Sequence, residues 1–440
     1  MRIIDSAEFD AYWRNLEVHA EDEVVNSAIR EVIAAVRKGG DKAVREFAAR
    51  FDKNAPERAE TPPETVKAAY QALQDTEPEL TASLELAARN IRTFAEYQRD
   101  QFRDFEFEIA PGVFTGQRVI PVERAAIYAP GGRFPLVSTV LMGVIPAIAA
   151  GVEEVILASP PQADGLPDRR ILAAAYLAGA RRVFAIGGAQ AIAALALGTE
   201  TIPQVDVIAG PGNKYVAAAK RLLFGEVGID FIAGPTDVLV IADGRDPYFQ
   251  GTMGPRPGPE DLVAADLLAQ AEHDPDARAR TLVPGRDMAN RIMAAVEKQL
   301  AALPSAETAQ ASLDAGGLII VYQSREEAIR IANTIAPEHL ELQVEDPNLW
   351  VPRLRNYGSL FVGAGAAEAL GDYSAGINHT LPTSGSARFS AGLSVRHFLK
   401  TPTSLRCGPG PGFDAVRLAA ERIARSEGLA GHEASAAARA

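Results

Sequence analysis

The sequence contains few of the residues on which many functional sites depend. Among its 440 residues there is one cysteine, Cys407, so an internal disulfide and a metal centre built from a cluster of thiolates are both excluded. Acidic side chains outnumber basic ones by 57 to 44, and the net charge of −13 argues against a protein that binds nucleic acid through its phosphates. The six histidines are few enough to be judged one at a time. These counts favour a reduced, acidic, cytoplasmic protein.

A membrane-spanning segment and a secretory leader are not expected either. The longest uncharged apolar run covers the 17 residues 136–152, but Ser138, Thr139 and Pro146 interrupt it, and it is short for a bilayer span. The first residues, Met-Arg-Ile-Ile-Asp-Ser, lead into charged sequence without the apolar core of a signal peptide. We therefore expect no membrane association and a buried helix over 136–152.

The order of the apolar segments predicts an α/β protein. Residues 21 to about 110 have apolar side chains at helical spacing, which predicts several amphipathic helices. Four short apolar runs follow, and their starts are 29, 28 and 24 residues apart, as expected of strand–helix units in a parallel sheet. These runs cover 125–129, 154–158, 182–186 and 206–209. Further strands are predicted at 229–233, 237–242, 280–283, 317–321, 340–344 and 359–362, and a last helix at 414–427. We expect two Rossmann-like parallel-sheet lobes, a helical N-terminal region and a small C-terminal extension.

Three of the first four predicted strands end in glycine-rich turns that lead into helices. The turns contain Gly131–Gly132, Gly187–Gly188 and Gly210–Gly212. Because ligands of open parallel sheets bind at the carboxyl ends of the strands, the backbone N–H groups of these turns suit an anion. Tight turns that require a positive φ explain the glycines equally well. The Gly-x-Gly-x-x-Gly fingerprint of dinucleotide sites is absent from the sequence.

Three groups of polar residues are candidates for chemistry. Gln270 and His273 are three residues apart, so they share one face of a predicted helix end and suit a divalent metal; a solvent-exposed helix terminus is the alternative. Glu338 and His339 are adjacent and offer two groups for proton transfer, although such a pair is common by chance. The loop 371–383 is suited either to binding a metal or polar substrate or to satisfying its own backbone; its polar residues include Asp372, Asn378 and His379.

With these residues in order, the chain resembles the histidinol dehydrogenase family over nearly its whole length. Eight motifs in the family's order make the resemblance specific. They lie at 127–132, 187–193, 210–216, 233–243, 266–273, 337–340, 371–373 and 378–383. The resemblance implies oxidation of the amino alcohol L-histidinol to L-histidine, in two NAD-dependent steps through an aldehyde, at a zinc site.

The resemblance also implies the role of individual residues. The implied zinc ligands are Gln270, His273, Asp372 and His432. The implied acid–base pair is Glu338 and His339, and the implied NAD contacts are Tyr128, Gln190 and Asn213. Substrate contacts are implied for Thr236, Glu427, His339 and the four zinc ligands. Bound zinc polarises a substrate oxygen, His339 takes the hydroxyl proton, and Glu338 activates water.

The resemblance further implies a homodimer in which the C-terminal tail of the partner completes the active site. The expected domains are an N-terminal arm (1–25), a discontinuous α/β domain with the metal and acid–base residues (26–124 and 237–385), a Rossmann-like NAD-contacting domain (126–236) and a dimerisation tail (386–440).

Three departures from the family pattern leave the substrate open. The loop 244–259 is longer than expected, Thr236 and Asp237 replace a usual Ser-Glu, and 396–402 differs from the usual sequence. One alternative is a paralogue that oxidises another small polar primary alcohol, such as sulfopropanediol, with the same zinc and NAD site. A catalytically silent small-molecule binding protein is a second alternative, disfavoured because all the implied ligands and acid–base residues are present.

Overall fold

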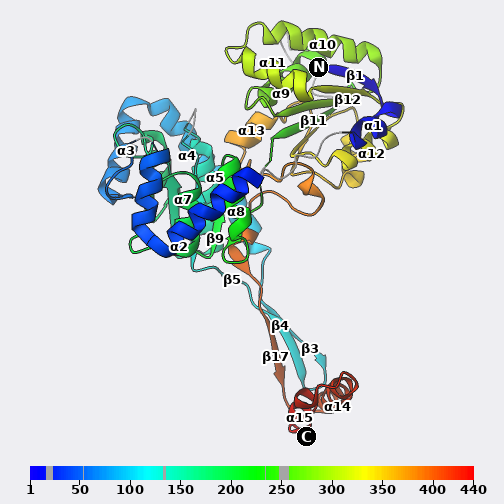
Figure 1. Cartoon of the computed structure of the whole chain (residues 1–440). Helices are drawn as coiled ribbons and strands as arrows, with labels where there is room; N and C mark the ends of the chain where they lie inside the picture. Colours follow the sequence, from blue (N-terminus) through cyan, green and yellow to red (C-terminus); the bar gives the residue numbers. More distant parts are fainter. Residues whose placement is uncertain (16–22, 53, 132–134, 233, 247–256) are drawn as a thin grey trace.

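The computed structural model describes residues 1–15, 23–52, 54–131, 135–232, 234–246 and 257–440. Two α/β lobes lie beside each other, and a narrow arm ending in the C-terminal helices extends away from them (Figure 1). The predicted α/β class with two parallel-sheet lobes is confirmed. In the part of the chain that the structure describes, no helix is both long and apolar enough to cross a bilayer. The apolar run at 136–152 forms α5 (Val137–Ala150), most of which is buried.

The first lobe contains a six-stranded sheet in the order β10-β9-β6-β7-β8-β2. Its strands are β2 (Glu60–Thr61), β6 (Arg124–Tyr128), β7 (Glu154–Ser159), β8 (Arg182–Ala185), β9 (Val207–Ala209) and β10 (Gly228–Ile229). They pair in parallel except β2, which runs antiparallel to β8. The chain order reverses between β6 and β9, and ligands of such sheets bind at the carboxyl ends of the strands on either side of that point. The strand expected at 229–233 is shorter than predicted, and Ala233 lies outside the described residues.

Helices cover both faces of this sheet. One apolar core joins it to α5, α3 (Pro63–Thr76), α4 (Pro78–Asp100) and α6 (Arg169–Ala178), and another joins it to α2 (Glu23–Phe51), α7 (Gly188–Leu197) and α8 (Lys214–Leu223). The expected domain boundaries differ here, because they group 26–124 with the second lobe, whereas α2, α3 and α4 pack on the first. An apolar stripe identifies a helix but does not specify which of two sheets it covers.

The second lobe repeats this arrangement with the strand order β1-β13-β12-β11-β14-β15, and all neighbouring strands are parallel. The strands are β1 (Arg2–Asp5), β11 (Asp237–Ala242), β12 (Arg278–Val283), β13 (Leu318–Val321), β14 (His339–Gln343) and β15 (Ser359–Val362). Its helices are α1 (Ser6–Arg14), α9 (Pro259–Ala271), α10 (Arg286–Leu300), α11 (Ala306–Gly316), α12 (Arg325–Ile335) and α13 (Glu368–Tyr373). Residues 2–14 of the expected N-terminal arm therefore belong to this lobe. Residues 16–22 of that arm and residues 247–256 of the long loop lie outside the described residues.

The arm consists of a three-stranded antiparallel sheet and two helices. Its elements are β3 (Phe105–Ala110), β4 (Val113–Gln117), β17 (Thr403–Cys407), α14 (Pro411–Ser426) and α15 (Ala430–Ala437). The helical prediction up to residue 110 is wrong for β3, whose Phe-Glu-Phe-Glu alternation has the period of a strand. A short pair, β5 (Ile120–Pro121) and β16 (Leu399–Lys400), joins the arm to the first lobe.

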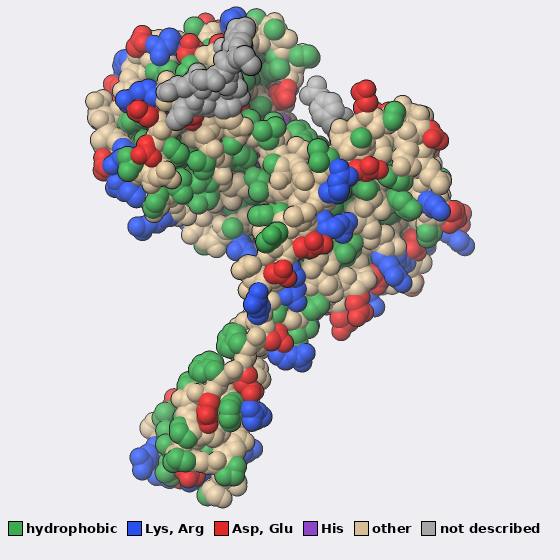
Figure 2. All heavy atoms as spheres, turned by 180° about the vertical axis from the view of Figure 1, so that it is seen from behind, with side chains coloured by type: hydrophobic (Ala, Val, Ile, Leu, Met, Phe, Trp, Pro, Cys, Tyr) green, Lys and Arg blue, Asp and Glu red, His purple; other side chains and the backbone are tan. Residues whose placement is uncertain are grey.

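Large apolar side chains are exposed on the arm. Phe105, Phe107, Leu405 and Ile423 are each more than half exposed, and Figure 2 shows hydrophobic side chains along this part of the molecule. Contiguous exposed apolar side chains are typical of a surface that another protein covers. The arm therefore carries exposed apolar side chains on both its sheet and its helix α14.

Candidate active site

The carboxyl edge of the first sheet brings together the turns after β6, β8 and β9. The Tyr128 hydroxyl at the end of β6 accepts a hydrogen bond from the Gly188 N–H at 3.1 Å. Gly210 has φ 114°, and a Cβ atom there would lie 2.2 Å from the Tyr128 carbonyl oxygen, so this turn requires glycine. The positive-φ explanation is thus correct for this turn.

The other two residues implied as NAD contacts lie at the same edge. The buried Gln190 in α7 donates to Asp52 at 3.2 Å, and Asn213 caps α8 by accepting from the N–H groups of Tyr215 and Val216 at 3.0 and 3.1 Å. Asp52, which follows α2, also accepts from the Gly187 N–H at 3.4 Å, and burial raises its pKa. Nothing in the sequence marks Asp52, since it lies 135 residues from its partner Gly187.

The acid–base pair lies at the amino ends of strands β11 and β14 in the second sheet. Glu338 immediately precedes β14, and its carboxylate accepts hydrogen bonds from the Thr236 hydroxyl at 2.5 Å and the Asp237 N–H at 3.1 Å. The Asp237 carboxylate in turn accepts from the Glu338 N–H at 3.1 Å. These reciprocal bonds hold Glu338 against the neighbouring strand. Burial raises the pKa of Glu338 to about 7, although the His339 charge and the Thr236 hydrogen bond oppose this shift.

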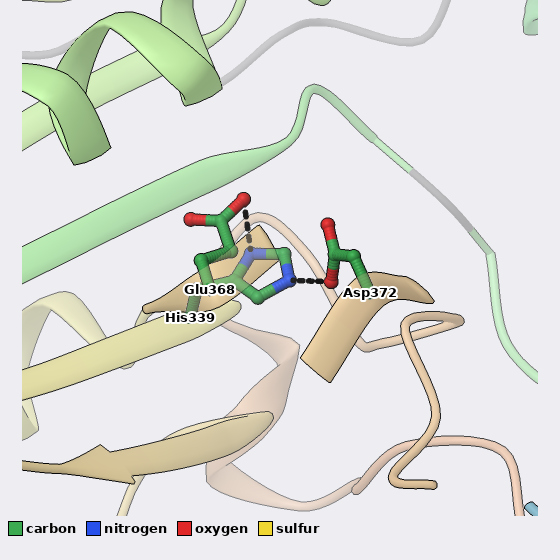
Figure 3. A group of neighbouring side chains, drawn as sticks. All are labelled: His339, Glu368 and Asp372. Atoms are coloured by element: carbon green, nitrogen blue, oxygen red, sulfur yellow. Dashed lines mark ion pairs between the residues drawn. The ribbon is translucent and has the colours of Figure 1, made fainter. Parts of the chain in front are cut away.

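His339 lies between two carboxylates of the short helix α13, as Figure 3 shows. Its Nδ1 is 3.7 Å from a Glu368 oxygen and its Nε2 is 3.4 Å from an Asp372 oxygen. Burial of the ring opposes protonation, but the Glu368, Glu338 and Asp372 carboxylates raise the pKa of His339 well above its usual value. Glu368 is not among the residues that the sequence predicts for the site; its only signal is its position one helical turn before Asp372.

Two further implied zinc ligands reach the same edge from α9. The buried Gln270 amide is 2.8 Å from the Thr236 hydroxyl, and its other end lies 3.0 Å from a Glu368 oxygen. His273 follows just beyond the end of α9 and is exposed, and its charge contributes to lowering the pKa of Asp372. Gln270 and His273 do lie at the end of one helix, as expected, and in the tertiary structure Glu368 lies beside Gln270, while His273 is linked to Asp372 only through the effect of its charge.

The described residues of this edge suit a metal ion by their chemistry. Ligand atoms of His339, Glu368 and Asp372 lie within 4.8 Å of one another. Both ring nitrogens of His339 are buried without a hydrogen-bond partner, an arrangement that is costly unless a bound group satisfies them. Imidazole nitrogen with carboxylate and amide oxygen suits zinc.

The loop that follows α13 connects this edge to the first lobe. The buried His379 ring has Nδ1 3.1 Å from the Asp372 carbonyl oxygen and Nε2 3.2 Å from the Thr139 hydroxyl of α5. Asn378 donates to the Met142 carbonyl of α5 at 2.6 Å and also accepts from the Thr380 N–H, so this loop does satisfy part of its own backbone. The candidate site therefore lies at the junction of the two lobes.

The two implied tail residues are far from this junction in the single chain. Glu427 ends α14 and His432 lies in α15, both at the tip of the arm (Figure 1). Both side chains are exposed. One chain thus brings together Gln270, His273, Asp372, Glu338 and His339, but not Glu427 or His432.

Known proteins resemble this chain in sequence and in structure. A family model described as histidinol dehydrogenase matches residues 16–440. The histidinol dehydrogenase of Methylococcus capsulatus is 44% identical over 95% of this chain and 92% of the relative, and that of Thermus thermophilus is 45% identical over 94% of each. The crystal structure of histidinol dehydrogenase from Elizabethkingia anophelis has a TM-score of 0.90 at 34% identity, covering 100% of this chain and 97% of that chain.

Proposed function

Because the chain belongs to the histidinol dehydrogenase family, we propose that it oxidises L-histidinol to L-histidine through the aldehyde, with NAD as the oxidant and zinc as the metal. The observation that carries this proposal is the buried Glu338–His339 pair, which lies beside Asp372 and Gln270 at the junction of the lobes. When bound, zinc would polarise the substrate oxygen as a Lewis acid, and two NAD molecules in turn would each accept one hydride.

The residues that would hold these groups follow from their positions. Gln270, His273 and Asp372 supply zinc donors from one chain. Tyr128, Gln190 and Asn213 line the carboxyl edge of the first sheet and would hold NAD. Helix α5 begins near this edge and contacts the loop that follows α13. Thr236 would contact the substrate, because its hydroxyl lies between Glu338 and Gln270.

The acid–base pair would carry both proton transfers. His339 takes the proton of the substrate hydroxyl through a ring nitrogen, and Glu368 and Asp372 stabilise the charge that the ring acquires. Glu338, as a carboxylate, takes a proton from the water that attacks the aldehyde before its oxidation. The buried position of both side chains keeps bulk water away from the reactive aldehyde.

A homodimer would complete the site. The exposed apolar side chains of the arm suit a second copy of this chain, and the arm carries Glu427 and His432 away from its own lobes. His432 of the partner subunit would then be the fourth zinc ligand, and Glu427 of the partner subunit would contact the substrate.

The purified protein is expected to produce about two NADH per L-histidinol, because a four-electron oxidation supplies two hydrides. The absorbance of NADH measures the yield, with and without a zinc chelator. Loss of turnover on chelation and recovery with added zinc support the proposal. Turnover of sulfopropanediol without turnover of L-histidinol would instead support the paralogue, and oxidation of neither alcohol would support the silent binding protein.

Thr236→Val is expected to shift the acidic limb of the pH–rate profile to higher pH. Glu338 activates water only when ionised, so the rate falls as the pH drops through its pKa, which is about 7. The Thr236 hydrogen bond lowers this pKa, and its removal raises it; a hydrogen bond to a charged group is worth roughly 1.5–3 kcal/mol, about one to two pKa units. The measurement is kcat/KM for the aldehyde against pH. Thr236→Ser keeps the hydroxyl and should keep the wild-type profile; identical profiles for Val and Ser would contradict the role of this bond.

A further inference from the structure

The strand that carries His339 has a buried polar face that the proposed reaction leaves largely unused. Strand β14 reads His-Leu-Glu-Leu-Gln, so His339, Glu341 and Gln343 point to one face while Leu340 and Leu342 pack in the apolar core on the other. Such alternation is typical of a strand whose polar face meets water. Here all five residues are buried. A buried Glu and Gln require partners, because unpaired polar groups are costly away from water.

Glu341 is linked to two other elements. One carboxyl oxygen accepts the N–H of Glu368, the first residue of α13, at 2.8 Å. The other oxygen accepts the Gln343 amide at 2.9 Å, and the same amide also donates to the Asp266 carboxylate of α9 at 2.9 Å. Glu341 therefore joins β14 to α13 directly, and through Gln343 it is joined to Asp266 on α9.

The Glu368 N–H requires an acceptor at position 341. A glutamine there has the same shape as glutamate and keeps one acceptor oxygen for this N–H. A leucine there has no acceptor.

Each of these hydrogen-bonded residues lies one helical turn, or one two-residue strand period, from a residue of the site. Asp266 is one helical turn before Gln270 on α9, and Glu341 is two residues after His339 on the same face of β14. The Glu368 N–H begins α13, which carries Asp372 one turn later. The three hydrogen-bonded elements are thus the elements that carry Gln270, His339 and Asp372.

We propose that Glu341 and Asp266 are positioning residues, which hold α9, β14 and α13 together beneath the site so that Gln270, His339 and Asp372 converge. This inference rests on the proposed function of the site. Both carboxyls act through the backbone of the elements that carry the site residues.

The test compares Glu341→Leu with Glu341→Gln in the full-length protein. Zinc affinity is measured by competition with a chromophoric chelator, and kcat is measured with L-histidinol. Glu341→Leu is expected to weaken zinc binding by about 10- to 100-fold, the usual effect of losing the groups that orient metal ligands. Glu341→Gln is expected to lose much less zinc affinity and kcat than Glu341→Leu, since it keeps an acceptor oxygen for the Glu368 N–H. Asp266→Ala, at a half-buried position, provides a second test should Glu341→Leu fail to fold, and it should weaken zinc binding like Glu341→Leu.

Two results would overturn the inference. Wild-type zinc affinity in Glu341→Leu and Asp266→Ala would show that these residues position nothing. Equal losses in Glu341→Gln and Glu341→Leu would show that the ionisable carboxyl itself, and not its hydrogen-bonded position, is required. NAD binding to the first lobe serves as the folding control for every variant. A wild-type protein that binds no zinc would contradict the proposed function instead, so the two failures are distinguishable.

Discussion

Replacement of His339 by asparagine is expected to lower kcat for L-histidinol by about 10²- to 10⁴-fold, the usual contribution of a positioned acid–base group. Asparagine retains polar atoms near the ring position but has no group that titrates near neutral pH. In the wild-type protein the Glu368 and Asp372 carboxylates stand at the two ring nitrogens, so they stabilise the positive charge that the ring acquires with a proton.

The experiment separates chemistry from binding. NADH formation is followed under steady-state conditions, and zinc content and NAD affinity are measured on the same preparation. Both should remain near the wild-type values when Gln270, His273, Asp372 and His432 are the zinc ligands. Loss of zinc from His339→Asn would instead make the His339 ring a ligand, since its nitrogen lies within 4.8 Å of Glu368 and Asp372 oxygens. His397→Asn is the matched control, a half-buried imidazole outside the proposed site, and should leave kcat unchanged. A kcat for His339→Asn within tenfold of wild type would exclude the acid–base role.

Replacement of His432 by alanine is expected to weaken zinc binding and abolish most turnover, although this residue lies at the tip of the arm, far from the other donors. Loss of the orienting partners of a metal ligand already costs about 10- to 100-fold in affinity, and loss of a ligand itself should cost more. Zinc affinity and kcat measure the effect. His432→Gln, with a different donor atom on a longer side chain, should recover the activity only in part.

Mixing two inactive variants tests whether the arm acts in the partner subunit. In a heterodimer of His432→Ala and His339→Asn, one site combines intact lobes with the intact tail of the partner, while the other site has both defects. Since random pairing gives half heterodimers, each with one active site of two, about a quarter of the wild-type activity should return. Either variant exchanged with itself should stay inactive. Recovery of no activity in the mixture, with heterodimers present, would contradict the shared site.

Most of the fold is predictable from local patterns. Short apolar runs between helices mark the strands at 154–158 and 182–186, because a strand buried on both faces is apolar throughout. Strand β3 is missed by the helical prediction for this region, although its sequence alternates. Both of its faces are largely exposed, so no buried apolar face marks it as a strand. Helix α11 is equally hard to predict, because its Ala-rich sequence has few large apolar residues at helical spacing.

The site is predictable only where motifs or spacing mark it. Gln270 and His273 lie three residues apart, and Glu338 and His339 are adjacent, so local spacing is enough to mark these pairs. Asp52 carries no such mark, because its partners Gly187 and Gln190 are distant in the chain. Glu368, Asp266 and Glu341 lie near site residues in the sequence, but the contacts that join them to other elements form only in the folded chain. The burial of Glu341 is also not predictable from the sequence, because the alternating pattern of β14 is the pattern of a strand whose polar face meets water.

The sequence by itself determined the α/β class, the exclusion of thiolate metal centres and the family resemblance, because composition, periodicity and motif order are local properties of the chain. The tertiary structure alone decided that α2, α3 and α4 cover the first sheet, that Glu368 and Asp372 enclose His339, and that the arm carries Glu427 and His432 away from their own lobes. These facts depend on contacts between residues far apart in sequence, and such contacts form only when a given apolar face is buried against one of several compatible surfaces.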